Sequence, residues 1–266
     1  MLKLHGVTLP HYKHTANLKA VKMDSPKTVT IPMNMHIGAQ AVPCVKKGDE
    51  VKVGQLIAEA DGYVSSPVYA SVSGTVSDVG TILASNGNQV NCITIESDGM
   101  GEISSNCTPK TITNYDEFIT AVRESGVVGL GGAGFPTSVK LDVKDTSRIE
   151  EIIINGAECE PYITSDTRTM IDSADLISEG IDLLKKFLDA KKIIIGIEKN
   201  KPEAIKEMNK LTDDITSVKV LPSIYPQGGE KVLIYNCTGK IVPEGKLPID
   251  VGVIVINCTT LAIIAN

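Results

Sequence analysis

A run of glycines is the strongest candidate for chemistry in this chain: Gly129-Leu130-Gly131-Gly132-Ala133-Gly134-Phe135-Pro136-Thr137. Each glycine weakens regular structure by roughly 0.5–1 kcal/mol relative to alanine, so this density of glycines needs a physical reason. A loop whose bare backbone approaches a phosphate or a flat ring supplies one, with Lys140 as a point charge for the phosphate. Two alternatives stay open. The first is a flexible linker, although linkers normally favour polar residues over Phe-Pro. The second is a Rossmann G-x-G-x-x-G site, which needs a strand before it and a long helix after it.

A second motif places two carboxylates in three residues: Asn155-Gly156-Ala157-Glu158-Cys159-Glu160-Pro161-Tyr162. It follows a predicted buried strand, and ligands of open α/β sheets bind at the carboxyl ends of strands. The side chains suit the hydroxyls of a ribose or ribityl chain and a heteroaromatic ring; an exposed polar loop is the alternative. A Cys159–His dyad is disfavoured because no histidine follows position 36.

Two further motifs follow predicted strands. The run Tyr225-Pro226-Gln227-Gly228-Gly229-Glu230-Lys231 opens a helix, where free N–H groups and the helix dipole favour anions, although a plain Pro-Gly turn also fits. The run Asn257-Cys258-Thr259-Thr260 carries small polar residues. Four such loops at predicted strand ends, all in one predicted domain, favour one composite ligand site.

The elements that position these motifs alternate between helix and strand after about residue 110. Asn114 and Glu117 form a capping box for a helix that Gly126 ends. A long helix is predicted over 166–188, and another is capped by Asn200 and Glu203. Buried strands are predicted over 151–154, 192–197, 217–221 and 253–256. Near-continuous apolar strands alternating with helices predict a parallel sheet covered on both faces.

Before residue 110 the sequence predicts many short strands separated by Gly and Asp, over 29–32, 51–58, 68–70, 74–76 and 92–95. Residues 45–60 and 66–76 look like the two halves of a biotinyl/lipoyl-type barrel-sandwich hybrid. A carrier domain of that type needs a lysine at its hairpin tip. Here the tip is Asp61-Gly62-Tyr63, so we expect no covalent biotin or lipoate.

The charge balance, the apolar runs and the cysteine spacing exclude several classes of function. The 26 basic and 32 acidic residues give a net charge of −6, and Trp is absent, so nucleic-acid binding is not expected. No apolar run approaches the ~20 residues that span a bilayer, and the first residues do not resemble a signal peptide, so a cytoplasmic protein is expected. The six cysteines include no CxxC pair, which predicts neither a metal site nor an iron–sulfur cluster in this chain.

Together the four motifs closely resemble those of the RnfC family, the NADH- and flavin-binding subunit of the Rnf ferredoxin:NAD oxidoreductase complex. They are more distantly similar to the flavin subunit of respiratory complex I. The stretch 36–43 and the barrel-sandwich segment also resemble RnfC, so the resemblance spans essentially the whole chain. PrdC, the RnfC-like electron-transfer protein of proline reductase, is also similar, and the motifs do not separate the two.

The resemblance implies FMN held by the glycine loop, with NADH stacked on the flavin ring. Phe135 is the implied aromatic wall for the dinucleotide and Glu230 a contact for its ribose. Leu130 departs from the complex I protein, which has Arg there. No catalytic side chain and no metal ligand is implied. The implied cofactor-binding residues are Gly129, Gly131, Gly132, Gly134, Phe135, Lys140, Asn155, Glu158, Glu160, Tyr225, Gly228, Glu230, Asn257 and Thr259.

We therefore expect an N-terminal β barrel-sandwich hybrid lobe at 1–110 and an α/β lobe like the complex I flavin subunit at 111–266. The expected function is hydride transfer between NAD(H) and FMN, in which the cofactors perform the chemistry. Members of the family continue into β-grasp-like and ferredoxin-like domains, and this chain ends at Asn266. A truncated chain is thus expected, with its [4Fe-4S] clusters in the missing region.

Expected partners are NADH and other subunits of an Rnf-type or proline reductase-type complex, with membrane contact only through those subunits. A place on the cytoplasmic face of the membrane follows from the same expectation. Two rival functions stay open: a non-catalytic assembly module without flavin, and an enzyme that uses NAD alone.

Overall fold

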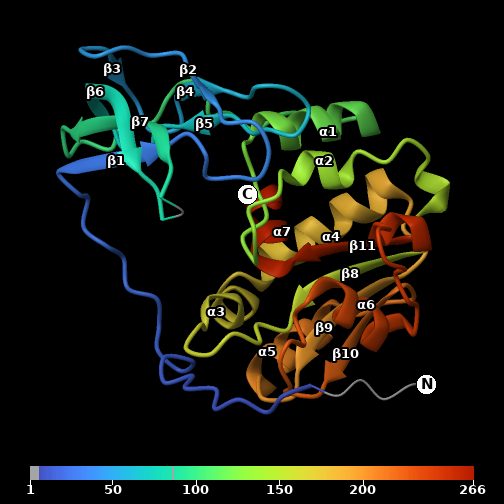
Figure 1. The fold of residues 1–266 in the computed structure, drawn as a ribbon. Coiled ribbons are helices and arrows are strands. Elements are labelled where there is room, and N and C mark those ends of the chain that lie inside the picture. Colours follow the sequence, from blue (N-terminus) through green and yellow to red (C-terminus); the bar gives the residue numbers. More distant parts are fainter. Residues whose placement is uncertain (1–5, 86) are drawn as a thin grey trace. The chain divides into compact units, whose positions relative to one another are not determined.

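The computed structural model describes residues 6–85 and 87–266 (Figure 1). They form two compact units: residues 21–142, called here the β unit, and residues 6–20 with 143–266, called the α/β unit. These units differ from the expected limits of 1–110 and 111–266. The stretch 111–142 joins the β unit, and the N-terminal arm joins the α/β unit. The expected domain limits remain a prediction.

The β unit contains two antiparallel sheets, with strand orders β1-β7-β6-β3 and β2-β4-β5. One core fills it, made of Ile31, Met33, Ile57, Val76, Ile93 and Ile95 among others. The prediction of a barrel-sandwich hybrid is confirmed. The strands are β1 Thr28–Pro32, β2 Val42–Pro43, β3 Glu50–Val51, β4 Leu56–Glu59, β5 Val68–Tyr69, β6 Gly74–Leu83 and β7 Gln89–Ser97.

Two helices complete the β unit, α1 Tyr115–Glu124 and α2 Thr137–Leu141. The Asn114 side chain accepts a hydrogen bond from Glu117 N at 2.9 Å, as predicted. The Glu117 carboxylate, however, accepts from Thr113 N, so the capping box is shifted by one residue on that side. Arg123 donates to Gly62 O at 2.7 Å, and Tyr69 donates to a carbonyl of α1. These bonds explain why α1 belongs to the unit of the β strands.

A four-stranded parallel sheet of order β10-β9-β8-β11 forms the centre of the α/β unit. Its strands are β8 Glu151–Gly156, β9 Ile193–Glu198, β10 Thr216–Leu221 and β11 Val253–Asn257. The predicted parallel sheet is confirmed. Chain order runs outward from β8 through β9 to β10 and then returns to β11 on the other side of β8. The direction of winding thus reverses between β8 and β11.

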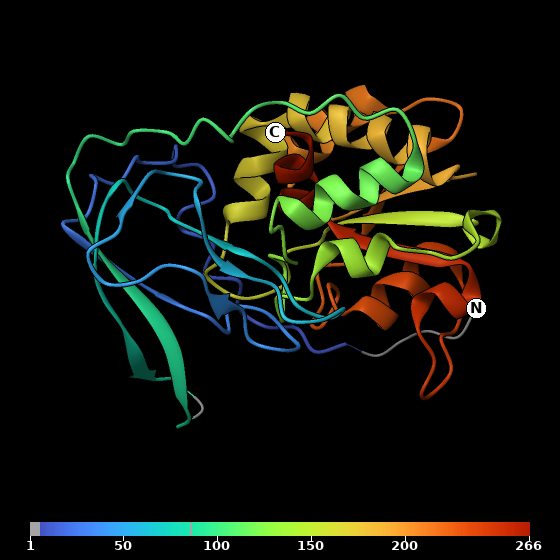
Figure 2. The same ribbon diagram turned by 90° about the horizontal axis from the view of Figure 1, so that it is seen from above.

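Helices cover both faces of this sheet. The helices α3 Ser165–Asp172, α4 Ala174–Leu188, α5 Pro202–Met208 and α7 Cys258–Ala265 contact one another in a chain of pairs, and α6 Glu230–Thr238 packs on β8, β9 and β11. Figure 2 shows α4 and α6 on opposite faces. Short 3-10 turns lie at Thr146–Arg148, Asn209–Leu211 and Pro248–Val251. No helix in the described residues is long and apolar enough to cross a membrane.

Two helix predictions were wrong in detail. The single helix expected over 166–188 is broken at Ser173 (φ −132°, ψ 37°), because α3 packs against α5 and α7 whereas α4 packs along α7. The expected cap by Asn200 and Glu203 does not form. Pro202 takes the first helical position, which its fixed φ suits, and this makes Lys201 the N-cap.

Candidate functional site

The carboxyl edge of the parallel sheet gathers three of the four predicted motifs. Asn155 at the end of β8 is in register with Asn257 at the end of β11, where the winding reverses. Asn155 Nδ2 donates to Gly228 O at 3.1 Å, and Cys159 Sγ accepts from Gly228 N at 3.2 Å. Such a switch point is where open α/β sheets bind ligands.

Glu158 is buried, and its carboxylate accepts hydrogen bonds from the first turn of α3. Oε1 accepts from Asp166 N at 2.6 Å, and Oε2 accepts from Thr167 Oγ1 at 2.5 Å. Burial raises the pKa of this carboxyl, and the bonds from Thr167 and the charge of Lys13 partly offset that rise. Glu158 also has a φ of +45°, a conformation in which its backbone turns sharply after the strand. The carboxylate thus anchors the loop to α3.

Asn257 and Thr259 converge on Asp166, a residue that the sequence analysis did not single out. Asn257 Nδ2 donates to Asp166 Oδ2 at 2.8 Å, and Thr259 Oγ1 donates to Asp166 Oδ1 at 2.6 Å. Asn257 Oδ1 accepts from Thr260 N at 3.0 Å, which caps α7. An acid in the first turn of a helix after a strand-end motif was the available signal.

Tyr225 and Glu160 form a neighbouring pair on the same edge. The negative charge of Glu160 and a hydrogen bond to it raise the pKa of the Tyr225 phenol. Val7 of the N-terminal arm exchanges two backbone bonds with Tyr225, at 2.9 and 2.8 Å. Glu230 is the first residue of α6 and is half-buried.

Two lysines hold the loop after β8 by its carbonyls, and the sequence analysis identified neither. Lys13 Nζ donates to Glu158 O and Glu160 O, each at 2.8 Å, and lies 3.8 Å from the Glu158 carboxylate. Lys201 Nζ donates to Ala157 O at 2.6 Å and pairs with the fully buried Glu198 at 3.1 Å. Burial lowers the pKa of Lys13. No local motif marks a lysine whose partners lie so far along the chain.

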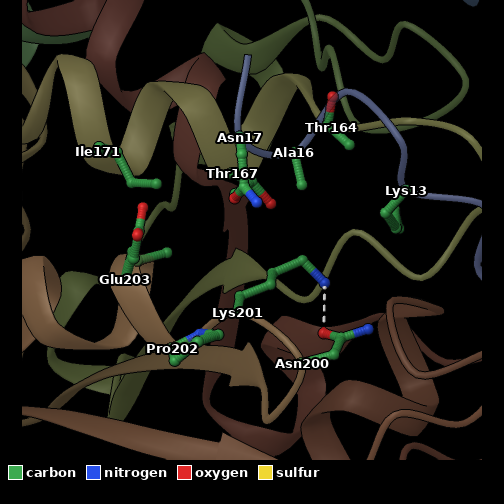
Figure 3. A pocket seen from close by; sticks show the side chains of 11 residues that line it. Lys13, Ala16, Asn17, Thr164, Thr167, Ile171, Asn200, Lys201, Pro202 and Glu203 are labelled. Atoms are coloured by element: carbon green, nitrogen blue, oxygen red, sulfur yellow. Dashed lines mark hydrogen bonds between the residues drawn. The ribbon is translucent and has the colours of Figure 1, made fainter. Parts of the chain in front are cut away.

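A cavity of about 260 Å³ lies beside these lysines, between the N-terminal arm, α3 and the start of α5 (Figure 3). Lys201 lines this cavity, and its Nζ donates to Asn200 Oδ1 at 3.1 Å. The other polar lining groups include Asn17, Thr164 and Glu203.

The glycine loop belongs to the β unit, and its backbone closes on itself. Gly129 N donates to Phe135 O at 2.9 Å, and Val128 bridges Pro136. The intervening backbone N–H groups of residues 131–134 have no hydrogen-bond partner in the described part of the chain. Gly131 and Gly132 are exposed, and a Cβ at Gly132 would meet nothing within 4 Å.

Gly134 differs from its neighbours in the loop. Its φ is +67°, and a Cβ there would lie 2.9 Å from Met35 O. Its carbonyl accepts from Ile37 N at 3.1 Å, so this end of the loop is fixed to the stretch 35–37. Phe135 and Lys140 are half-buried, and Lys140 lies on the short helix α2. The short helix predicted after the loop is present.

Comparison with known proteins gives the family. Residues 122–266 match the model described as the Nuo51 FMN-binding domain. The chain belongs to this family. Residues 3–100 match the RnfC barrel sandwich hybrid domain, so the predicted RnfC-type combination of domains is confirmed.

Two curated relatives of this Nuo51-family chain are each named as a subunit of a ferredoxin:NAD(+) oxidoreductase complex. A relative from Clostridium ljungdahlii, part of the proton-translocating ferredoxin:NAD(+) oxidoreductase complex, is 44% identical over 96% of this chain and 56% of the relative. A relative from Acetobacterium woodii, part of the Na(+)-translocating ferredoxin:NAD(+) oxidoreductase complex, is 42% identical over 98% and 60%. The chain therefore spans somewhat over half the length of these relatives.

Among solved structures, the fold of this Nuo51-family chain is similar to a chain of NAD+-reducing [NiFe]-hydrogenase in the H2-reduced state. The TM-score is 0.51 at 22% identity, over 60% of this chain and 33% of that chain. This likeness supports the fold alone.

The cysteines of this Nuo51-family chain are six free thiols. Burial raises the pKa of the Cys159 thiol, which disfavours the thiolate that a cysteine nucleophile needs. Within residues 6–85 and 87–266, no three His, Cys, Asp or Glu side chains are grouped to hold a metal ion.

Proposed function

We propose that this chain is the flavin- and NAD(H)-binding part of an RnfC-like electron-transfer protein. The observation that carries the proposal is the glycine loop. It presents exposed glycines and consecutive N–H groups without partners in the described chain, with open space around Gly132. Consecutive free backbone N–H groups form concavities that bind anions such as phosphate. These residues fit the phosphate or the ring edge of FMN.

The residues proposed to hold FMN by its phosphate and ring are Gly129, Gly131, Gly132, Gly134 and Lys140. The edge of the parallel sheet supplies Asn155, Glu158, Glu160, Asn257 and Thr259. There the bonds to Asp166 and Lys13 fix the backbone before a ligand arrives, which lowers the ordering cost of binding. We assign Phe135, Tyr225, Gly228 and Glu230 to the dinucleotide.

Bound FMN would supply the hydride chemistry with the nicotinamide of NAD(H). The protein then needs to orient the two rings and exclude water. No side chain is required as an acid or base, which agrees with the absence of histidine after His36 in the sequence.

Partners follow from the relatives, whose names describe components of ferredoxin:NAD(+) oxidoreductase complexes. We propose that this chain exchanges electrons with [4Fe-4S] clusters outside residues 1–266, in the rest of its own protein or in another protein of the complex. Association with the cytoplasmic face of a membrane would then come through partner subunits. A proline reductase-type complex is the other proposed setting.

Anaerobic titration with FMN, followed by NADH, tests this function. FMN bound by the loop should show quenched fluorescence, and NADH should then bleach its visible absorbance. If FMN stays free at concentrations that saturate flavoproteins, the non-catalytic assembly module is favoured. If NADH binds without flavin, the enzyme that uses NAD alone is favoured.

A further inference from the structure

The loop after β8 directs three backbone carbonyls at one point, and the ammonium group of Lys13 occupies that point. Lys13 Nζ donates to Glu158 O and Glu160 O, each at 2.8 Å, and also to Ile163 O. The Glu158 carboxylate lies 3.8 Å from the same nitrogen. A lysine ammonium has three N–H donors, so these carbonyls use all of them. Lys13 therefore has no donor left for a ligand.

The conformation of this loop needs a compensating positive charge. Glu158 and Tyr162 have left-handed backbones, with φ of +45° and +67°, which residues with a Cβ rarely adopt. Carbonyl oxygens that point at one centre repel one another through their partial negative charges, and buried polar groups without partners are unfavourable. The Lys13 side chain is only 14% exposed, so its ammonium, rather than bulk water, satisfies these carbonyls.

The cation comes from a distant part of the sequence, because Lys13 lies on the N-terminal arm (Figure 3). Two contacts on either side of Lys13 attach the arm to the same loop. His11 O accepts from Tyr162 N at 3.0 Å, and Thr15 Oγ1 lies 2.6 Å from Thr164 Oγ1. The arm therefore holds the ammonium in place from both directions along the chain.

Backbone carbonyls that converge on one centre are also the ligands that bind K+ in proteins. The ammonium ion and K+ are close to each other in size, whereas Na+ is smaller and needs shorter contacts to oxygen. The 2.8 Å contacts of Lys13 with two of the carbonyls therefore suit the two larger ions.

We propose that residues 158–163 form a cage for a monovalent cation, which Lys13 fills as a tethered ammonium, and that the filled cage positions Glu158 and Glu160 for FMN. The second part rests on the proposed function, and the cage itself does not. Lys13 is then a positioning residue, because all its donors face the loop and it acts on the cofactor site only through that loop. An empty cage should accept K+ or free ammonium more readily than Na+.

The test is cation rescue of Lys13→Ala, which removes the ammonium group and leaves room for a free ion. Melting temperature and FMN affinity are measured in sodium, potassium and ammonium chloride at equal concentration, so that ionic strength is constant. In sodium chloride the variant should melt below the parent and bind FMN about tenfold more weakly, the magnitude of one charge-assisted hydrogen bond. Potassium and ammonium chloride should restore most of both losses.

Lys13→Met is the matched variant, because its side chain is nearly as long as lysine and brings an uncharged methyl group to the cage. It should show the same losses in all three salts. The parent and Lys210→Ala, which removes an exposed lysine paired with Glu207, measure the general effect of each salt. Neither should prefer potassium or ammonium to the extent that Lys13→Ala does.

Equal losses of Lys13→Ala in the three salts would overturn the cage, and so would equal rescue of Lys13→Met. A Lys13→Ala chain that stays unfolded in every salt also contradicts it, since free ammonium then fails to replace the tethered group.

The melting measurement needs no FMN, which separates the two proposals. If the parent does not bind FMN while potassium and ammonium stabilise Lys13→Ala, the electron-transfer function fails and the cage stands. If melting is rescued but Lys13→Ala binds FMN like the parent in sodium chloride, the positioning of Glu158 and Glu160 by Lys13 is wrong.

Discussion

The glycine loop of the β unit and the sheet edge of the α/β unit differ in how far their polar groups are paired by hydrogen bonds. At the sheet edge, polar side chains bond to one another and to helix termini: Glu158 accepts from the backbone of Asp166, and Asn257 donates to the Asp166 carboxylate. Two lysines donate to the loop carbonyls. In the glycine loop, N–H groups of residues 131–134 have no partner in the described chain. The contrast separates a frame whose polar groups are paired within the protein from a loop whose backbone donors are not, and we propose that those donors bind the flavin. Variants in each region should therefore fail differently.

The largest expected effect on stability comes from Lys201→Met. This change leaves the fully buried Glu198 carboxyl without its lysine partner, and it leaves the carbonyl of Ala157 without the donor that Lys201 supplies. Breaking one side of a buried ion pair costs about 3–5 kcal/mol. Chemical denaturation should show this loss. The control Lys210→Met, at an exposed pair with Glu207, should change stability by less than about 1 kcal/mol. Similar small losses in both variants would mean that the frame does not depend on Lys201.

The next effect is expected from Gly134→Ala, at the fixed end of the glycine loop. An alanine there keeps a strained φ of +67° and brings its Cβ to 2.9 Å from Met35 O. A cost of about 1–3 kcal/mol is expected for such a conformation. Thermal melting should detect it. Gly132→Ala is the matched control, because its Cβ meets nothing within 4 Å, and it should melt like the parent. Equal melting of the two variants would remove the distinction within the loop.

The smallest effect concerns pH and Glu158. Its pKa is raised by burial above the ordinary 4.5, so the folded protein keeps the proton at pH values where the unfolded chain has lost it. The contribution of Glu158 to stability is therefore greatest in acid and declines as pH rises from about 4.5 through the folded pKa. Glu158→Gln should flatten this part of the curve of unfolding free energy against pH. An unchanged slope contradicts the assignment.

Local patterns predicted much of the fold. The Asn114 cap, the end of α1 near Gly126 and the four apolar strands depend on residues close in sequence. The break at Ser173 could not be predicted, because the apolar face continues across it and only packing against α5 and α7 sets the break.

Sequence motifs predicted which loops lie at the candidate site, but they did not predict which distant side chains hold those loops in place. The runs after β8, β10 and β11 do meet at one edge, as their places at strand ends implied. Lys13 and Lys201 were missed because each holds a carbonyl more than 40 residues away, and no local spacing records such a contact. Gly132 and Gly134 look alike in sequence, and only their φ and surroundings separate a glycine in open space from one held against the backbone of Met35.

The most direct test of the central claim is FMN titration of Gly132→Val. A Cβ at position 132 meets nothing within 4 Å, so circular dichroism and melting should match the parent. The isopropyl group would occupy the room that a phosphate or ring needs at the loop N–H groups. Losing two backbone hydrogen bonds to a charged phosphate costs about 3–6 kcal/mol, so FMN affinity should fall at least about a hundredfold. A folded Gly132→Val that binds FMN as tightly as the parent would show that the glycine loop does not hold the flavin.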